Sequence, residues 1–546
     1  MSKVFGIDLG TTYSCISYID EYGKPVVLKN LDGQHTTPSV VLIDGNDIIV
    51  GAEAKRSLEV EPEKTVPFIK RKMGKENDIV SIDGIDYHAP EISAMILTKL
   101  VNDANDELRQ TGVINAGEEI KDVVITCPAY FGMNERKATQ TAGELAGLNV
   151  LNIINEPTAA AISYGVSGQN KDETVLVYDL GGGTFDITVM NINNNAISVV
   201  CTGGDDELGG KDWDEALMNY VAERYDEEYG EDIMDDFDTV SQLYVQVEEW
   251  KKSLTSREKV NIVVNGPSGR LREELTREQY EELTRDLLNR TKNLLDDVLK
   301  KSEAKGFPVS RIDKVLLVGG SSRMPQVANM LQKDYGITPE LADPDEAVAK
   351  GAAIYAANEK VFNDFVSEEA AKTGRSVEEI IDQNAIDGSL DTKFAQTAST
   401  SIKITNVLSR TYGIEAIVGE RGETKIINML KINDALPAKH VQMFYTHVEG
   451  QTGADISLYE SRSTENEMEI DDKRPITVIN MKFNTAVPVG TPIAVQMALD
   501  NSGVLHIIAL EQYSNSKLDT TFSLSNQMTD AELNSASIRM AKANVE

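Results

Sequence analysis

A glycine-containing turn interrupts a β-strand pattern near the N-terminus, and the same design returns in the middle of the chain. The first copy is "VFGIDLGTTYSCISYID", in which an apolar run ends at Asp8, a Gly-Thr-Thr turn follows, and apolar alternation resumes at Tyr13. The second copy is "VYDLGGGTFDITV", in which Asp179 takes the place of Asp8. One such loop is most often an ordinary hairpin with an aspartate in its turn. The repetition predicts two hairpins with a common function.

The residues after each turn exclude two frequent phosphate-binding motifs. A Walker loop requires Gly-Lys-Ser or Gly-Lys-Thr leading into a helix, and the dinucleotide fingerprint also requires a helix after its glycines. Here β-type alternation follows the turn. The alternative is a hairpin whose turn amides point outward together and bind anionic oxygens. Two such hairpins face to face would hold a polyphosphate, with Asp8 and Asp179 approaching a hydrated Mg²⁺.

Other residues of the two turns fit the same interpretation. Glycines let the backbone approach a phosphate closely, and threonines supply hydroxyl groups. The residues concerned are Gly10, Gly181, Gly182, Gly183, Thr11, Thr12 and Thr184.

The pattern of apolar and polar residues changes along the chain. β-type and helical segments alternate up to about residue 357, which is typical of α/β folds, and the periodicity from Tyr280 to Ser302 predicts one long amphipathic helix. Residues 358–396 are polar and are interpreted as an insertion or connector. From 399 to 525, short β-type runs with a hairpin turn at Asn501-Ser502-Gly503 predict an all-β sandwich. A helical pattern returns from Thr529 to Val545.

Composition restricts the partners and the compartment. The chain has 88 Asp and Glu against 53 Lys and Arg, a net charge of -35, which would repel nucleic acid and anionic membrane surfaces. We therefore expect neither as a partner. Its three cysteines are distant from one another in sequence, which argues for a reducing compartment. Without an apolar run of membrane-spanning length or a leader pattern, the protein is predicted to be cytoplasmic.

Several segments resemble, in order, signatures of the actin and sugar-kinase superfamily, and most closely its seventy-kilodalton heat-shock chaperone branch of the DnaK type. They are "GIDLGTTYSC", "TCPAYF", "INEPTAAAISYG", "YDLGGGTFDI", "LGGKDWD", "LLVGGSSRMP" and "DPDEAVAKGAA". A fainter likeness to that family's peptide-binding domain extends from about Tyr412 to Val545. The resemblance implies an actin-like two-lobed α/β ATPase domain over 1–357, a polar insertion and linker over 358–406, a β-sandwich substrate-binding domain over 407–525, and the start of a helical lid over 526–546.

The resemblance also implies catalytic roles. Lys70 in "FIKRKMG" would orient the attacking water and stabilise charge on the γ-phosphate of ATP. Glu156 would position the water or the metal, and Asp179, Thr184 and Asp186 would lie near the nucleophile. Each residue also has an ordinary explanation, Lys70 as a surface charge and Glu156 as a carboxylate favoured at a helix N-terminus.

Nucleotide and ion contacts follow from the same resemblance. Asp8 and Asp179 would bind Mg²⁺ through water, and K⁺ is a further candidate ion. Glu248, Lys251, Lys252 and Thr255 would share one helical face, which is otherwise explained as an exposed charged face. Adenine would lie between the Lys252 and Arg323 stems. The full set implied to bind ATP or ADP is Asp8, Gly10, Thr11, Thr12, Tyr13, Gly181, Gly182, Gly183, Gly203, Glu248, Lys251, Lys252, Thr255, Gly319, Gly320, Ser321, Arg323 and Asp345.

By resemblance, the protein is an ATP-dependent molecular chaperone that hydrolyses ATP to control its binding and release of unfolded polypeptide. An extended peptide would bind along a strand edge. A J-domain protein and a nucleotide exchange factor are the implied partners. Candidate residues for the peptide pocket, which are otherwise ordinary core, are Ile414, Ile417, Phe444, Ala454 and Ile456.

Some segments depart from the family pattern. The linker segment "SIKITN" is less apolar than expected, the lid would be short, and Asn152 replaces the basic residue that contacts J-domain partners. These departures support a second hypothesis, a regulatory or exchange-factor-like relative that binds ATP with little turnover. A third hypothesis, a small-molecule kinase on the same fold, is disfavoured by the β-rich region that follows.

Overall fold

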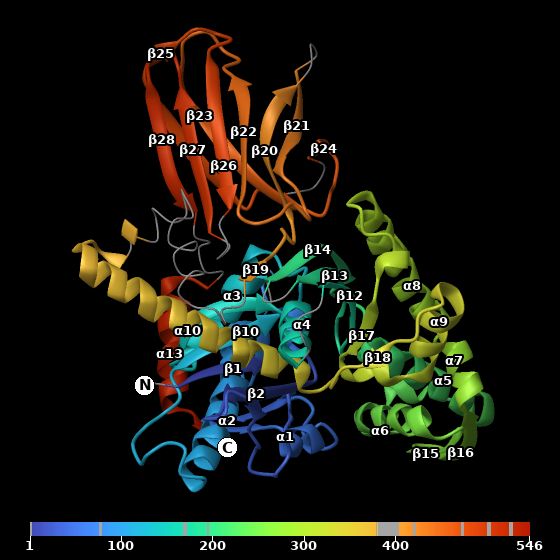
Figure 1. The fold of residues 1–546 in the computed structure, drawn as a ribbon. Helices are drawn as coiled ribbons and strands as arrows, with labels where there is room; N and C mark the ends of the chain where they lie inside the picture. Colours follow the sequence, from blue (N-terminus) through green and yellow to red (C-terminus); the bar gives the residue numbers. More distant parts are fainter. Residues whose placement is uncertain are drawn as a thin grey trace. The chain divides into compact units, whose positions relative to one another are not determined.

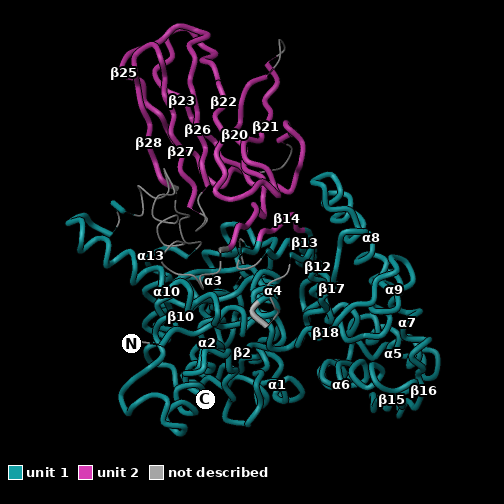
Figure 2. Tube along the Cα trace, viewed as in Figure 1, with its two compact units in different colours: residues 1–197, 203–402, 526–546 teal, residues 198–202, 403–525 magenta. Residues whose placement is uncertain are grey.

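The chain divides into two compact units, which are coloured separately in Figure 2. One unit combines residues 1–197, 203–402 and 526–546, and the other combines 198–202 with 403–525. The computed structural model describes residues 3–75, 79–167, 172–193, 196–377, 379–380, 403–418, 422–470, 474–499, 504–522 and 528–546.

The first sheet of unit 1 contains the N-terminal hairpin. Its order is β11-β10-β1-β2-β3, and β4 also pairs with β2. The apolar strand β1 is central because it runs parallel to β10 on one side and antiparallel to β2 on the other. The bounds are β1 Val4–Asp8, β2 Tyr13–Ile19, β3 Pro25–Val27, β4 Thr37–Pro38, β10 Asp122–Cys127 and β11 Asn149–Asn155.

The second sheet of unit 1 repeats that arrangement. Its order within the unit is β18-β17-β12-β13-β14, and β12 lies between an antiparallel partner, β13, and a parallel one, β17. The prediction of a duplicated hairpin is therefore confirmed, and the structure adds a parallel strand beside each copy. The bounds are β12 Asp172–Leu180, β13 Phe185–Asn193, β14 Ala196–Asp205, β17 Lys314–Val318 and β18 Glu340–Leu341.

Helices follow the strands, as the α/β pattern predicts. The α-helices are α1 Ala52–Ser57, α2 Ala89–Gln110, α3 Met133–Leu145, α4 Glu156–Ser167, α5 Gly210–Tyr229, α6 Phe237–Ser256, α7 Arg277–Leu283, α8 Arg285–Ala304, α9 Pro325–Tyr335 and α10 Ala347–Thr373. The 3₁₀ turns are η1 Ile69–Lys72, η2 Ile233–Asp235, η3 Val309–Arg311 and η4 Gly320–Arg323, and two hairpins pair β8 Ile79–Ile82 with β9 Ile85–His88 and β15 Lys259–Gly266 with β16 Gly269–Thr276.

Two glycines allow close packing at the centre of unit 1. A side chain at Gly6 in β1 would overlap the backbone of α10, and one at Gly351 in α10 would overlap Ala159 of α4. Helices α4 and α10 accordingly lie side by side, as Figure 1 shows. Because α10 extends to Thr373, the first part of the segment interpreted as a connector continues this helix, and residues 381–402 lie outside the described residues.

One helix prediction is wrong in detail. The pattern from Tyr280 to Ser302 predicts a continuous helix, but α7 and α8 are separated at Thr284, whose backbone departs from helical geometry with φ -104° and ψ 11°. The Thr284 hydroxyl donates to the Tyr280 carbonyl at 2.9 Å, a local hydrogen bond that competes with regular helix.

Unit 2 contains two antiparallel sheets, ordered β24-β21-β20-β23-β25 and β22-β26-β27-β28. Buried and less buried residues alternate along β26 and β27, so their sheet has one face in the core, as predicted for a sandwich. The turn predicted at 501–503 lies outside the described residues. The bounds are β19 Lys403–Thr405, β20 Thr411–Val418, β21 Glu423–Leu430, β22 Ala438–Tyr445, β23 Gln451–Ser461, β24 Glu467–Glu469, β25 Thr477–Val487, β26 Pro492–Leu499, β27 Leu505–Glu511 and β28 Ser516–Phe522.

The C-terminal segment belongs to unit 1. Helix α13 (Asp530–Lys542) begins with a capping box between Thr529 and Glu532, and its Arg539 forms a two-bond ion pair with Glu91 of α2. The chain then enters β29 (Asn544–Val545), which extends the sheet β29-β6-β5-β7. The helix predicted over 529–545 therefore ends before this strand. The remaining bounds are β5 Val41–Asp44, β6 Asp47–Val50 and β7 Thr65–Val66.

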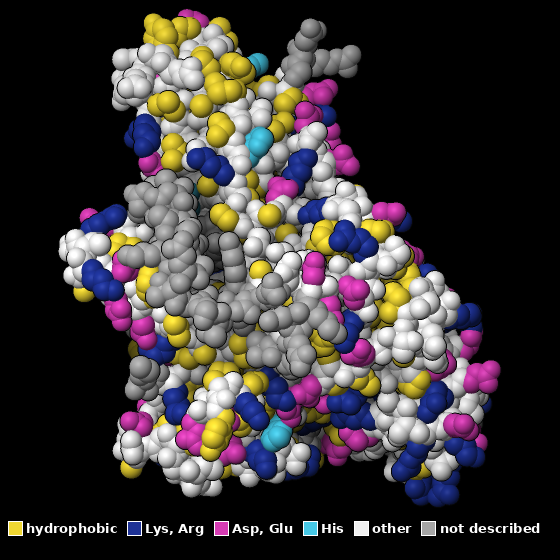
Figure 3. All heavy atoms as spheres, in the orientation of Figure 1, with side chains coloured by type: hydrophobic (Ala, Val, Ile, Leu, Met, Phe, Trp, Pro, Cys, Tyr) yellow, Lys and Arg dark blue, Asp and Glu magenta, His cyan; other side chains and the backbone are white. Residues whose placement is uncertain are grey.

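The surface charges, the apolar character of the helices and the cysteines can be compared with the composition. On the face of unit 1 visible in Figure 3, acidic and basic side chains are interspersed. Among the described residues, none of the helices combines the length and apolar character needed to cross a bilayer. Cys15, Cys127 and Cys201 are buried, and none of these three thiols is in a disulfide.

Candidate nucleotide site

The two glycine turns meet directly inside unit 1. A side chain at Gly182 would overlap Thr12, and one at Gly183 would overlap Thr11. These two positions therefore require glycine because the threonines of the first turn occupy the space beside them. The predicted face-to-face arrangement of the hairpins is present.

The carbonyl groups of the second turn are held by helix α5. The first amides of that helix, those of Gly210 and Lys211, donate to the carbonyls of Gly181 and Gly182 at 2.9 and 2.8 Å. In a trans peptide the following N–H points opposite to the carbonyl, so the amides of Gly182 and Gly183 point away from α5. Neither amide has an acceptor among the described residues. The turn thus presents unpaired donors, as an anion-binding nest requires.

A cavity of about 510 Å³ lies against both turns. It collects residues from both sheets, from α6 and from the turn before α9. The predicted site residues that line it are Asp8, Gly10, Thr11, Thr12, Tyr13, Lys70, Glu156, Asp179, Gly181, Gly182, Thr184, Glu248, Lys251, Lys252, Thr255, Gly319, Gly320, Ser321, Arg323 and Asp345.

Lys70 and Glu156 form a buried ion pair at this cavity. Lys70 comes from η1 and Glu156 is the first residue of α4, where the helix dipole favours a carboxylate. Burial alone would lower the pKa of Lys70, but the charges of Glu156 and Asp8 raise it above the ordinary value. The lysine is therefore a buried permanent cation, unlike the surface charge that was its alternative explanation.

Asp8 and Asp179 are the uncompensated charges of the cavity. Each cation that lines it has a carboxylate partner, for example Lys251 with Asp214 at 2.7 Å. Among the described residues, Asp8 and Asp179 have no basic side chain within ion-pair distance. Burial, followed by the charge of Glu156, raises the pKa of Asp8 to about 7, and the same two causes raise that of Asp179 well above its usual range.

Such a pair of carboxylates fits a divalent cation. A double positive charge would offset their mutual repulsion and their burial, and oxygen is the ligand atom that Mg²⁺ prefers. Among the described residues, no group of three or more acidic, His or Cys side chains is placed to hold a metal. The residues therefore fit an ion bound largely through water and phosphate oxygens, and Mg²⁺ at Asp8 and Asp179 stays a prediction.

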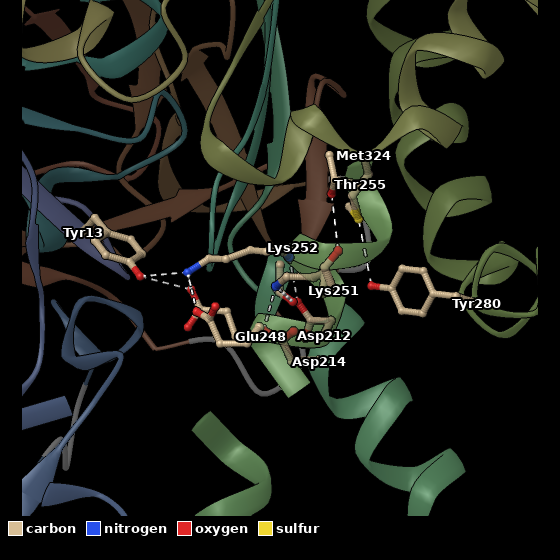
Figure 4. Close-up of polar contacts among 12 residues, drawn as sticks. Tyr13, Asp212, Asp214, Glu248, Lys251, Lys252, Thr255, Tyr280 and Met324 are labelled. Atoms are coloured by element: carbon tan, nitrogen blue, oxygen red, sulfur yellow. Dashed lines mark hydrogen bonds and ion pairs between the residues drawn. The ribbon is translucent and has the colours of Figure 1, made fainter. Parts of the chain in front are cut away.

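Unit 1 has two halves, one built around the first sheet and one around the second. Glu248 connects these two halves across the cavity (Figure 4). It pairs with Lys55 of α1 and, at 2.9 Å, with Lys252 of its own helix, and the Tyr13 hydroxyl donates to it at 3.2 Å. Burial alone would raise the pKa of Glu248, but Lys55 and Lys252 lower it to about 2. A carboxyl with a depressed pKa contributes its full stabilisation above its unfolded value of about 4.5 and loses it only as the pH falls towards 2. This cross-cavity latch, Lys55–Glu248, therefore remains charged at physiological pH.

Removing the cross-cavity latch should speed nucleotide release. In Lys55→Gln we expect ADP to dissociate about five- to tenfold faster, because a partly buried ion pair that joins the two halves is lost. Stopped-flow displacement of a fluorescent ADP analogue measures the rate. Lys259→Gln, which removes the exposed Lys259–Glu274 pair of the β15–β16 hairpin, is the matched control. Equal rates in Lys55→Gln and wild type would contradict a latch.

Three predicted residues lie outside the cavity lining. Gly203 is in β14, where a side chain would overlap Val298 of α8, so its role is helix packing. Gly183 faces Thr11, as described above. Asp186 is 1% exposed, and its Oδ1 accepts from the Ala129 amide at 2.9 Å, while Oδ2 has no partner among the described residues. Burial, then Glu156 and Asp179, raise the pKa of Asp186 well above its usual range.

The candidates for the peptide pocket differ in exposure. Ile414 and Ile456 are 3% and 4% exposed and belong to the core of the sandwich. Ile417 is 49% exposed, and Phe444 and Ala454 are partly buried. In this conformation only the last three offer surface to a ligand.

Sequence reasoning assigned no role to several charged residues of the cavity, among them Lys55 and Asp214. Lys55 is in a short helix without a motif, and Asp214 is the last residue of the "LGGKDWD" segment that resembles a family signature. Burial raises the pKa of Asp214 to about 6, although Lys251 opposes the shift. The available signals for Asp214 were its place in that segment and its position in the first turns of the helix that follows the second hairpin.

The sequence of nearly the whole chain matches known proteins. The Hsp70 protein family matches residues 4–369 and 367–546. A relative, the chaperone protein DnaK of Thermosipho africanus (strain TCF52B), is 35% identical over 548 aligned positions, which cover 97% of this chain and 81% of the relative. The chain therefore belongs to the Hsp70 family.

Proposed function

We propose that this protein is a chaperone that hydrolyses ATP to control its binding and release of unfolded polypeptide segments. The observation that carries the proposal is the cavity between two facing glycine turns, with a buried Lys70–Glu156 pair and two uncompensated aspartates on its wall. A triphosphate with a divalent cation has the charge distribution that these groups complement.

The side chains suggest a division of roles in hydrolysis. The unpaired amides of Gly182 and Gly183 would bind phosphate oxygens, and the permanent cation of Lys70 would stabilise negative charge that develops on the γ-phosphate. Glu156 would orient the attacking water through its contact with Lys70. Asp186 lies outside the cavity lining, and its unpartnered Oδ2 and raised pKa suit it to hold a proton there. Mg²⁺, when bound by Asp8 and Asp179 through water, would neutralise the phosphate charges.

Removal of the two aspartate charges should abolish the contribution of Mg²⁺ to nucleotide affinity. For wild type, we expect ADP to bind at least about tenfold more tightly with Mg²⁺ than with a chelator. For Asp8→Asn/Asp179→Asn, that ratio should fall to about one to two, because neutral amides give little attraction to the cation. Calorimetry with and without Mg²⁺ measures the ratio. A variant that keeps the wild-type ratio would remove these residues from the proposed ion site.

Unit 2 is the proposed peptide-binding part. Within the described residues β22 pairs with β26 alone, and its Val441 and Tyr445 are 52% and 63% exposed. Hydrophobic side chains also gather on the face of unit 2 visible in Figure 3. An extended peptide could use such an edge for main-chain hydrogen bonds and the apolar side chains for contact. Ile417, Phe444 and Ala454 remain our pocket candidates.

A J-domain protein and a nucleotide exchange factor belong to the proposal as partners, and a reducing cytoplasm as its location. Asn152, at the position where the family pattern has a basic residue, donates from Nδ2 to the Tyr355 hydroxyl at 3.0 Å. A neutral side chain with an internal partner cannot make the charged contact that a basic residue would make with a J-domain protein. This contact favours the second candidate, a regulatory or exchange-factor-like relative that binds ATP with little turnover.

Steady-state ATP turnover, alone and with a reduced, permanently unfolded polypeptide, tests the proposal. Turnover that rises several-fold with polypeptide is the expected result. Tight ATP binding without turnover under both conditions would instead favour the regulatory relative, and transfer of phosphate to an added sugar or acid would favour a kinase.

A further inference from the structure

Arg71, the residue after Lys70, reaches across to the second glycine turn. Its Nε donates to the Gly183 carbonyl at 3.0 Å, and its Nη2 and Nη1 lie 2.7 and 3.4 Å from the two carboxylate oxygens of Asp212. The side chains of Arg71 and Asp212 are 14% and 17% exposed. Lys70 and Arg71 therefore connect the same 3₁₀ turn to two different elements, α4 and the second glycine turn.

Asp212 is itself fixed by the start of α5. Its Oδ2 accepts from the Gly209 amide at 2.6 Å, and its own amide donates to the Gly209 carbonyl at 2.9 Å. Gly209 in turn packs on the second turn, because a side chain there would come within 2.6 Å of the Gly183 backbone. Arg71 thus binds a carboxylate that cannot move independently of the turn.

The three carbonyls of the turn consequently have three donors. Helix α5 supplies two of them, for Gly181 and Gly182, and Arg71 supplies the third, for Gly183. By the trans-peptide geometry, holding the Gly183 carbonyl directs the Thr184 amide to the opposite side. Thr184 lines the cavity, and its amide has no acceptor among the described residues. The donor that Arg71 orients is therefore available to a ligand in the cavity.

Arg71 comes from a different part of unit 1 than the two donors of helix α5, the amides of Gly210 and Lys211. Gly210 and Lys211 belong to the same half of unit 1 as the turn, whereas η1 lies in the chain between the strands β2 and β10 of the first sheet. The Thr184 amide is consequently fixed only while the two halves are together. Phe68, before this 3₁₀ turn, has a left-handed backbone with φ 57°, a conformation that costs free energy for a bulky residue and persists where the surroundings require it.

We propose that Arg71 is a positioning residue that orients the Gly183–Thr184 peptide towards the terminal phosphate of the nucleotide, and so links closure of the cavity to recognition of that phosphate. The proposal rests on the proposed function, since it assumes that ATP is the ligand. Arg71 needs no contact with nucleotide in this role. Its guanidinium fork binds Asp212 and Gly183 together, which a lysine ammonium on a flexible stem cannot reproduce.

Arg71→Lys tests the proposal through discrimination between nucleotides. By calorimetry we expect ADP affinity within about twofold of wild type and affinity for a non-hydrolysable ATP analogue roughly 10- to 100-fold lower, the usual effect of losing a charge-assisted hydrogen bond. Single-turnover hydrolysis should slow by a similar factor. Asp212→Asn should have a smaller effect of the same kind, and the double variant should be no worse than Arg71→Lys alone, because both changes act on one network.

Arg224→Lys, which alters the exposed Arg224–Glu273 pair on α5, is the matched control and should behave as wild type. If Arg71→Lys lowers the affinities for ADP and for the analogue by the same factor, or changes neither, the role of Arg71 is purely structural and the proposal is overturned. If wild type hydrolyses no ATP, the proposed function fails, while the ratio of affinities still decides the role of Arg71.

Discussion

Replacement of Lys70 by methionine should reduce single-turnover ATP hydrolysis by roughly 10³-fold while leaving ADP affinity within about tenfold of wild type. The reason is that Lys70 is a buried cation at the cavity whose charge has no substitute nearby, since the other lysines there are paired with different carboxylates. Rapid mixing with radiolabelled ATP measures the chemical step, and calorimetry measures ADP binding.

The single variant has a second effect that must be separated from the first. Without Lys70, Glu156 is a buried and unpaired carboxylate, which should cost about 3–5 kcal/mol of folding free energy. Lys70→Met/Glu156→Gln removes both charges and should regain most of the stability without regaining activity. Lys75→Met, which breaks the exposed Lys75–Glu207 pair, controls for loss of a positive charge nearby. Hydrolysis by Lys70→Met within about tenfold of wild type would exclude the role assigned to Lys70.

The features that sequence reasoning identified share a local cause. Each glycine hairpin is a continuous segment, and the face formed by Glu248, Lys251, Lys252 and Thr255 follows from helical periodicity within α6. The strand, turn and helix around Gly319 are likewise consecutive. Patterns of this kind are readable because all their members are neighbours along the chain.

Contacts between distant segments left no such pattern. Lys55 and Glu248 are 193 positions apart, and Arg71 and Asp212 are 141 apart. Their pairing depends on how the two halves of unit 1 close, a property of the tertiary fold. Arg71 is the neighbour of Lys70, yet periodicity and turn chemistry do not distinguish a lysine that lines the cavity from the residue after it.

Gly203 and the two buried isoleucines show a different limit of sequence reasoning. Family position suggested ligand contact, but Gly203 packs against α8, and Ile414 and Ile456 face the sandwich core. Glycine and isoleucine are used for close packing and for core as readily as for binding sites. Residue type and position therefore did not decide between the two uses, and only burial did.

Loss of the Arg539 side chain should release the C-terminal segment from unit 1. Glu91 is fully buried in the folded protein, and both of its carboxylate oxygens accept from Arg539, at 2.6 Å each. In Arg539→Ala this carboxylate would be buried without its partner, or else α13 would leave and expose it. Breaking a buried ion pair typically costs about 3–5 kcal/mol, so the opening equilibrium of the segment should rise at least about 100-fold.

Hydrogen exchange reports this opening at defined amides. The Val50 amide donates to the Glu546 carbonyl, and the Glu546 amide to the Ile48 carbonyl, both at 2.9 Å. Their protection should fall together in Arg539→Ala, and that of the β1 amides should not change, because β1 is in another sheet. Lys542→Ala, at an exposed position of the same helix, should leave all of them protected. Unchanged protection of Val50 and Glu546 in Arg539→Ala would mean that the apolar contacts of Met540, Ala543 and Val545 hold the segment without the ion pair.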